Sequence, residues 1–259
     1  MKLNKLMFRE YDIRGIWNED ITEEISYYIG RAYATKLLSL KKNKMIVGYD
    51  NRLSSPIIEK NLVKGLTDGG VDVVRLGLVT TPMYYYAWDK LNIHCGIMIT
   101  ASHNPKEYNG FKMSYNGTHN CFGNEVAELY YIILNGIYSK GNGSITDANI
   151  KEDYIKMINS HINMGSNKLK VIYDCGNGTT SIVAKDIFVS NDNIEYIPLF
   201  AESDGTFPNH HPDPAVESNL TILKEKVKEL IKWYMDTYGV NKDQAVRDIE
   251  SVMLRISHK

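Results

Sequence analysis

Residues 96–113, GIMITASHNPKEYNGFKM, place a polar loop directly after an apolar strand pattern. The apolar run ends at Thr100, and the loop that follows contains asparagine, proline and glycine, which favour turns. A strand pattern resumes at GFKMSY, residues 110–115. The pattern therefore predicts that Ser102 lies in a tight loop at the end of a buried strand.

Helical and strand patterns alternate on both sides of this stretch. Thr22 can cap a helix whose apolar residues recur every three or four positions. Ser55-Pro56 opens another helix, which Gly69-Gly70 ends. Further helices are expected at 81–91 and 124–138, and strands at 44–50, 71–77, 95–100 and 110–115. Such alternation is typical of an α/β fold in which helices cover both faces of a sheet.

A connector rich in Gly, Ser and Asn at 139–149 predicts the end of a first domain, residues 1–145. A second domain, residues 146–226, repeats the pattern with only two strands. Its expected helices are 153–162 and 179–188, and its expected strands are 169–174 and 194–200. Because a small sheet is hard to stabilise alone, we expect this second domain to be incomplete.

A helical tail, residues 227–259, is expected to follow. Apolar residues form one helical stripe over 220–234, Gly239 interrupts it, and Asn241 with Gln244 indicates a new helix cap. A second apolar stripe comprises Val246, Ile249, Met253 and Ile256. These stripes predict packing, either within the chain or against a partner.

Composition excludes several classes of protein. With 30 basic and 31 acidic residues, the net charge of −1 gives no reason to expect binding to nucleic acid or to an anionic membrane. No apolar run reaches transmembrane length, and the N-terminus lacks the apolar core of a signal peptide. Three scattered cysteines do not make a disulfide framework or a CxxC zinc site. We expect a cytoplasmic protein.

Three polar loops follow predicted strands, at 49–52, at 80–82 and around Ser102. In open α/β sheets, ligands bind beyond the carboxyl ends of the strands, so Ser102 is a candidate site residue. A serine hydrolase fits poorly, because there is no G-x-S-x-G motif and His103 is adjacent in sequence.

A phosphorylated Ser102 fits its surroundings better. Phosphoserine carries about −1.5 to −2 charges near neutral pH and needs cations and donors around it. His103 and Lys112 are close in sequence, Arg14 could join them through folding, and Asn104 would help to shape the loop. The alternative is an ordinary serine in a surface loop.

Six segments occur in order and together resemble one family. They are FREYDIRG (8–15), GYDNRLSSP (48–56), GLVTTPMYYYA (77–87), GIMITASHNPKEYNGFK (96–112), VIYDCGNG (171–178) and FPNHHPDP (207–214). From about residue 6 to 225 the chain resembles the α-D-phosphohexomutases, the phosphomannomutase/phosphoglucomutase enzymes. The resemblance implies a three-layer α/β/α first domain and part of a second domain of the same type.

The resemblance also implies an isomerase, an intramolecular phosphotransferase acting on hexose phosphates. Ser102 would be the phosphoserine, with Mg²⁺ on its phosphate oxygens, and Lys112 the general acid/base, with His103 beside them. Tyr11 and Arg14 match family residues that face the phosphate, and Asn104 joins them as an expected phosphate- or substrate-binding residue. A hexose 1,6-bisphosphate would serve as the activator and intermediate.

These 259 residues depart from the family pattern in one respect that matters for chemistry. The Asp-Gly-Asp-x-Asp-Arg loop, which binds Mg²⁺ in the family, does not occur, since Asp204-Gly205 is followed by Thr206. The sugar-reading loop and the fourth-domain phosphate loop do not occur either, so the sequence does not select the hexose. Two hypotheses stay open. One is an enzyme, or a piece of one that a complementing chain completes; the other is an inactive remnant or protein-binding module, self-associating through the tail.

Other polar clusters have simpler interpretations. His210, His211 and Asp213 offer metal ligands, but prolines on both sides favour a structural loop. Asp50 and Arg52 are expected to pair beneath the Ser102 loop. The tyrosines at 84–86 are expected to pack, and the segment DCGNGTT to form a strand-to-helix turn.

Overall fold

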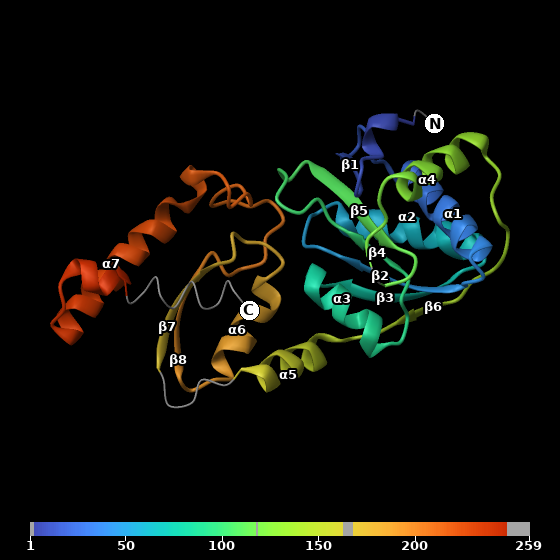
Figure 1. Cartoon of the computed structure of the whole chain (residues 1–259). Coiled ribbons are helices and arrows are strands. Elements are labelled where there is room, and N and C mark those ends of the chain that lie inside the picture. Colours follow the sequence, from blue (N-terminus) through green and yellow to red (C-terminus); the bar gives the residue numbers. More distant parts are fainter. Residues whose placement is uncertain (1–2, 118, 163–167, 248–259) are drawn as a thin grey trace.

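Two α/β units follow one another along the chain, and their arrangement is shown in Figure 1. This structure is a computed structural model that describes residues 3–117, 119–162 and 168–247. Among those residues, no helix combines the length and the hydropathy needed to cross a membrane.

The first unit is built on a six-stranded mixed sheet with the order β1-β5-β4-β2-β3-β6. Its strands are β1 (Ile13–Ile16), β2 (Lys44–Tyr49), β3 (Asp72–Leu78), β4 (Gly96–Ile99), β5 (Tyr108–Ser114) and β6 (Ile145–Asp147). The strands β4, β2, β3 and β6 run parallel, whereas β5 is antiparallel to both β4 and β1. The carboxyl ends of the parallel strands therefore lie along the same edge of the sheet.

Helices cover both faces of this sheet. One face packs against α1 (Glu23–Ser39), α2 (Ser55–Asp68) and α4 (Asn124–Asn135), and the other packs against α3 (Thr81–Lys90). Because side chains alternate along a strand, Val47 belongs to the first core and its neighbour Ile46 belongs to the second. The predicted three-layer α/β/α architecture is confirmed.

Local sequence signals determine where these helices begin. The Thr22 hydroxyl accepts a hydrogen bond from the Ile25 backbone N–H at 3.1 Å, and Thr80 caps α3 in the same way. Pro56 occupies the first turn of α2, where it displaces no hydrogen bond. At the end of α4, Gly136 adopts a left-handed conformation with φ of 67°.

The strand β6 was not predicted, since its residues lie inside the expected connector at 139–149. The backbone of β6 pairs in parallel with β3, and Asp147 accepts two hydrogen bonds from the Arg75 guanidinium. A three-residue strand with exposed side chains has no periodic pattern in the sequence. Only its long-range partner reveals it.

The second unit contains a two-stranded parallel sheet between helices. Its elements are α5 (Lys151–His161), β7 (Leu169–Asp174), α6 (Ser181–Val189), β8 (Ile194–Leu199) and α7 (Thr221–Tyr238). A short 3-10 helix, Glu217–Leu220, precedes α7, and another, Lys5–Met7, lies near the start of the first unit. On one face Tyr173 stacks on Phe188 of α6, with ring centroids 4.8 Å apart. On the other face the Lys170 ammonium lies 4.2 Å from the Trp233 ring of α7. The strands of this thin sheet are mostly half-buried, as expected for an incomplete domain.

The outer edge of β8 is protected by proline. The carbonyls of Asn193 and Leu199 accept hydrogen bonds from Leu169 at the start of β7 and from Cys175 just after its end, so odd-numbered positions of β8 face β7. Pro198 therefore lies on the outer side, where it offers no N–H to another strand. No residue within β7 is a proline, so β7 carries no such block.

The tail is helical as far as the structure describes it. Gly239 ends α7 in a left-handed conformation, and the Asn241 side chain accepts a hydrogen bond from the Gln244 N–H at 2.9 Å, as predicted. No residue of α7 is fully buried. The positions Ile249, Met253 and Ile256 of the second predicted stripe lie outside the described residues.

A buried carboxyl on α2 is expected to make the stability of the first unit depend on pH. Glu59 is buried, and its Oε1 has no hydrogen-bond partner among the described residues. Burial raises the pKa of Glu59 from 4.5 to about 7, and the nearby Arg75 guanidinium only partly opposes this shift. Between pH 4.5 and about pH 7, Glu59 is therefore protonated in the folded chain and ionised in the unfolded chain.

Replacing Glu59 with glutamine is expected to flatten the pH dependence of stability. Because the folded-state pKa is raised, the wild-type chain should lose stability as the pH rises from 4.5 to about 7. The loss from this group is about 3 kcal/mol, at about 1.4 kcal/mol per pKa unit. Urea unfolding of the wild type and Glu59→Gln at about pH 5 and about pH 8 measures the difference. Parallel pH profiles for the two proteins would contradict the assignment.

Candidate active site

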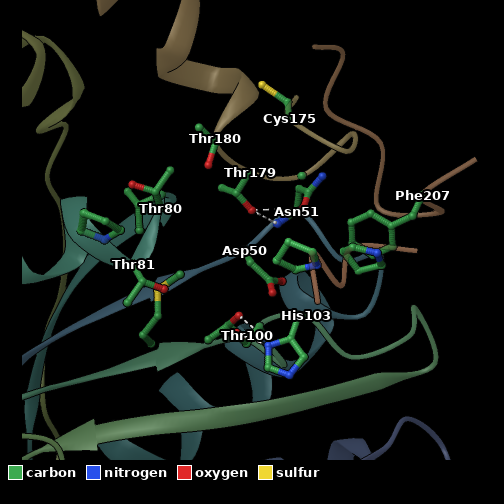
Figure 2. A pocket seen from close by; sticks show the side chains of 17 residues that line it. Asp50, Asn51, Thr80, Thr81, Thr100, His103, Cys175, Thr179, Thr180 and Phe207 are labelled. Atoms are coloured by element: carbon green, nitrogen blue, oxygen red, sulfur yellow. Dashed lines mark hydrogen bonds between the residues drawn. The ribbon is translucent and has the colours of Figure 1, made fainter. Parts of the chain in front are cut away.

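A cavity of about 380 Å³ lies between the two units, beside the Ser102 loop (Figure 2). From the first unit it is lined by Asp50, Asn51, Val79, Thr80, Thr81, Pro82, Met98, Thr100, Ser102 and His103. From the second unit it is lined by Cys175, Gly178, Thr179, Thr180, Phe207, Pro212 and Pro214. Serine and threonine hydroxyls recur around it, so the cavity suits a polar ligand that accepts and donates hydrogen bonds.

The parallel strands of the first sheet bring the three predicted loops together. Asp50 follows β2, Thr80 lies just beyond β3, and Thr100 follows β4. All three residues line the cavity. The strand-end argument from sequence therefore located this edge of the sheet correctly.

The Ser102 backbone adopts a conformation that non-glycine residues rarely take. Its φ is 56°, in the left-handed region, which costs about 1–2 kcal/mol for a residue with a Cβ. Its N–H donates a hydrogen bond to the Thr100 hydroxyl at 2.9 Å, and its own hydroxyl lies 3.3 Å from His103 Nδ1. Ser102 and His103 are both exposed. The surrounding structure therefore holds the turn while the side chain stays accessible.

Arg52 supplies most of that support from beneath the loop. Its side chain is 1% exposed, and its Nε donates to the Asp50 carboxylate at 3.2 Å, which confirms the predicted pair. Its two terminal nitrogens donate to four carbonyls of the loop, those of Ser102, Asn104, Pro105 and Tyr108, at 2.6–3.1 Å. Burial lowers the pKa of the Arg52 guanidinium, and the Asp50 carboxylate opposes that shift. A single buried cation thus fixes the path of residues 102–108.

Arg14 reaches the same loop from β1. Its Nη1 donates to the Asn104 side-chain oxygen at 2.7 Å, and its Nη2 donates to Asp12. Its Nε is buried without a hydrogen-bond partner among the described residues. The structure therefore brings Arg14, Asn104, His103 and Ser102 together, although Arg14 and Ser102 are far apart in sequence.

Lys112 and Tyr11, unlike Ser102 and His103, do not line the cavity. Lys112 pairs with Met98 across β5 and β4, so both side chains project from the same sheet face. Met98 lines the cavity, whereas half-buried Lys112 lies one strand away and does not line it. Tyr11 is 69% exposed and does not line the cavity either.

Comparison with known proteins agrees with this architecture. Residues 5–138 match the family model for phosphoglucomutase/phosphomannomutase, alpha/beta/alpha domain I, and residues 152–236 match the model for domain II. The chain belongs to the phosphoglucomutase/phosphomannomutase family. The domain II match continues into α7, beyond the expected start of the tail at residue 227.

Three relatives show the extent of the likeness. A phosphomannomutase/phosphoglucomutase of Pseudomonas syringae pv. tomato is 44% identical over 86% of this chain and 47% of its own length. A phosphoglucomutase of Neisseria meningitidis serogroup B is 39% identical over 86% of this chain and 48% of its own length. The crystal structure of a phosphoglucomutase/phosphomannomutase family protein from Burkholderia thailandensis superposes with a TM-score of 0.83 at 33% identity, covering 88% of this chain and 51% of that one. The chain thus spans about half the length of the curated relatives that it matches.

The described residues of this family member do not form a site for Mg²⁺. No group of three or more His, Cys, Asp or Glu side chains is placed among them to hold a metal ion. In the cavity wall, Asp50 accepts hydrogen bonds from the Arg52 side chain and from the Ser55 hydroxyl. Carboxylate oxygens are the ligands that Mg²⁺ prefers, and the Asp50 carboxylate in the cavity wall already accepts these hydrogen bonds.

His210 contacts protein groups on both sides of its ring. Its Nε2 lies 3.3 Å from both oxygens of Asp174, and its Nδ1 donates to the His211 carbonyl at 2.7 Å. The ring also packs edge-on against Phe200. These contacts attach the 207–214 segment to the end of β7, in agreement with the structural interpretation of the sequence.

Sequence reasoning missed the wall that the second unit contributes. The segment DCGNGTT was assigned to a turn, and its residues Cys175, Gly178, Thr179 and Thr180 also line the cavity. The usable signal was its position after β7, because the same strand-end rule applies to this parallel pair. The contribution of Phe207 depends on how the two units meet, which no local pattern encodes.

Proposed function

We propose that this chain provides the phosphoserine half of a phosphohexomutase, an isomerase that moves phosphate between the 1- and 6-positions of a hexose. The observation that carries the proposal is the position of Ser102, whose accessible side chain lines a cavity between two α/β units. A buried arginine holds the strained backbone turn at this residue. Such precise placement is what phosphoryl transfer requires of a protein.

The proposed step transfers a phosphoryl group without net hydrolysis. As a sugar hydroxyl oxygen bonds to phosphorus, the bond from phosphorus to Ser102 Oγ breaks. Lys112 takes the proton of the sugar hydroxyl and passes it to Ser102 Oγ, the oxygen that leaves phosphorus. The resulting hexose 1,6-bisphosphate then gives its other phosphoryl group back to Ser102 by the reverse exchange.

Cations and donors around Ser102 support this role. A phosphate on Ser102 would carry about −1.5 to −2 charges. His103 Nδ1 lies 3.3 Å from the serine hydroxyl, and Arg14 reaches the loop through Asn104. We assign phosphate or substrate binding to Arg14 and Asn104. Tyr11 is included from the family resemblance, as its exposed ring is free to meet a substrate.

We include Mg²⁺ in this proposal on the condition that groups outside the described residues supply part of its ligands. The phosphate oxygens on Ser102 could provide one ligand, and the described residues do not provide a carboxylate cluster. A complementing segment or chain, or self-association through the tail, would have to bring the remaining ligands. The substrate class is a hexose phosphate, and we propose a cytoplasmic location, in keeping with three free cysteines in the structure.

A second candidate is a protein-binding module derived from a phosphohexomutase. It is favoured by α7, an amphipathic helix without a fully buried residue, which also exposes Ile222 and Trp233. This candidate needs no metal and no phosphoserine, so the same experiment separates the two.

Turnover by the chain and by its Ser102→Ala variant tests the proposed function. Both are incubated with glucose 1-phosphate, a trace of glucose 1,6-bisphosphate and Mg²⁺, and glucose 6-phosphate is followed with a coupled dehydrogenase. The proposal predicts conversion by the wild type above that of Ser102→Ala, increasing when the second half of a relative is added. Equal rates for the two proteins, with and without that half, would favour the binding module.

A further inference from the structure

Two adjacent residues of the β2–α2 loop hold the two walls of the cavity. Arg52 binds the Ser102 loop through four of its carbonyls. Asn51, the residue before it, binds the second unit. Asn51 also lines the cavity.

The contacts of Asn51 are reciprocal. Its Nδ2 donates to the Asn177 carbonyl at 2.7 Å, and its Oδ1 accepts a hydrogen bond from the Thr179 hydroxyl at 3.1 Å. The Asn51 backbone N–H in turn donates to Thr179 Oγ1 at 3.1 Å. The Asn51–Thr179 contact is drawn in Figure 2. Three hydrogen bonds thus join one residue of the first unit to the turn before α6.

The turn that Asn51 binds is itself a junction within the second unit. Asn177 is 4% exposed and has a left-handed φ of 56°. Its side chain donates to the Glu202 carbonyl at 3.0 Å and accepts from the Asn209 side chain at 2.7 Å. Holding Asn177 therefore also holds the segment around residues 202–209.

That segment packs directly on the Asn51–Arg52 backbone. A Cβ added to Gly205 would lie 2.2 Å from the Asn51 carbonyl oxygen, so only glycine permits this approach. The ring of Phe207 lies 5.3 Å from the Arg52 guanidinium carbon. The second unit thus touches the same residue that supports the Ser102 loop.

We infer that Asn51 is a positioning residue, which couples the second-unit wall of the cavity to the Ser102 loop through Arg52. Its catalytic meaning rests on the proposed role of Ser102, whereas the coupling itself does not. When Asn51 loses its amide, the turn before α6 is released. The contacts of Gly205 and Phe207 on Arg52 loosen with it, and the Ser102 loop opens more often.

Hydrogen exchange of the whole chain tests this coupling without any phosphoryl donor. The reporters are backbone amides with local partners in the loop, such as those of Ser102, Asn104 and Tyr108. In Asn51→Ala we expect exchange about tenfold faster both in these amides and in residues 175–178. A tenfold change corresponds to a decrease of about 1.4 kcal/mol in the free energy of local opening. Thr179→Val, which keeps the shape and removes the hydroxyl, should act alike, and Thr179→Ser should stay near the wild type.

Asn61 offers a matched control. Its half-buried side chain also makes two hydrogen bonds, to Glu23 and to the Ile57 carbonyl, but it does not line the cavity. Asn61→Ala should leave both reporter segments unchanged, and β2 amides report any global loss of stability. If Asn51→Ala and Thr179→Val accelerate residues 175–178 alone, the coupling is absent and the inference is wrong. A Ser102 that takes no phosphate would overturn the proposed function and leave this result standing.

Discussion

An Arg52→Met variant is expected to lose about 3–5 kcal/mol of the free energy of unfolding, since it breaks a buried ion pair from one side. Methionine fills much of the volume but donates no hydrogen bond. Asp50, which is 7% exposed as a residue, would keep its carboxylate buried without its cation. The four loop carbonyls that Arg52 binds would also lose a donor, and each unsatisfied buried group costs about 1–3 kcal/mol.

Urea unfolding of Arg52→Met beside Arg75→Met measures this loss against a matched control. Arg75 also makes a two-bond contact with an aspartate, Asp147, but on the surface. Its replacement should cost less than about 1 kcal/mol, since exposed ion pairs contribute little. Arg52→Lys should be intermediate, because a lysine keeps the charge with fewer and less directed donors. Equal losses in Arg52→Met and Arg75→Met would show that Arg52 does not support the loop.

A Lys112→Met variant is expected to slow phosphoryl transfer from Ser102 to a hexose phosphate by about 10²–10⁴-fold, the usual range for a general acid/base. The lysine projects from the face of the sheet that carries the cavity, one strand from Met98. Its neighbours Phe111 and Met113 point into the opposite core. The replacement should therefore leave stability nearly unchanged.

Rapid-quench measurement on chain that already carries phosphate separates this effect from binding. The rate at which labelled phosphate leaves the protein for the sugar is compared among the wild type, Lys112→Met and Lys106→Met. Lys106 is an exposed lysine in the Ser102 loop and should have little influence. A Lys112→Met rate within about twofold of the wild type would remove Lys112 from the proton transfer, since general acid/base catalysis contributes far more than that.

Local signals in the sequence predicted most of the first unit. Thr22, Pro56 and Gly69 act within one turn of the helices whose ends they mark, so their effect is readable without the fold. The Ser102 loop was placed correctly because parallel strands must end at one edge of the sheet. Each of these inferences needs only neighbours in sequence or a general rule of sheet geometry.

Features that depend on distant partners were not predictable in the same way. Ile145–Asp147 becomes a strand because β3 offers a free edge, which its own residues do not encode. Arg52 looked like one half of an ion pair, and its hydrogen bonds to the loop carbonyls appear only when residues 102–108 fold over it. The Asn51–Thr179 contact joins positions 128 residues apart. Family resemblance identified Ser102 as a site residue, but it did not predict the contacts by which the two units hold the Ser102 loop.

Phosphopeptide mapping shows directly whether Ser102 carries the phosphoryl group. The whole chain is incubated with glucose 1,6-bisphosphate and Mg²⁺, digested, and sequenced by mass spectrometry, with Ser102→Ala treated in parallel. We expect one phosphate on the peptide that contains residues 101–105, located at Ser102, and an unmodified peptide in the variant. Phosphate on another residue in both proteins, or an unmodified Ser102 even after the second half of a relative is added, would contradict this expectation.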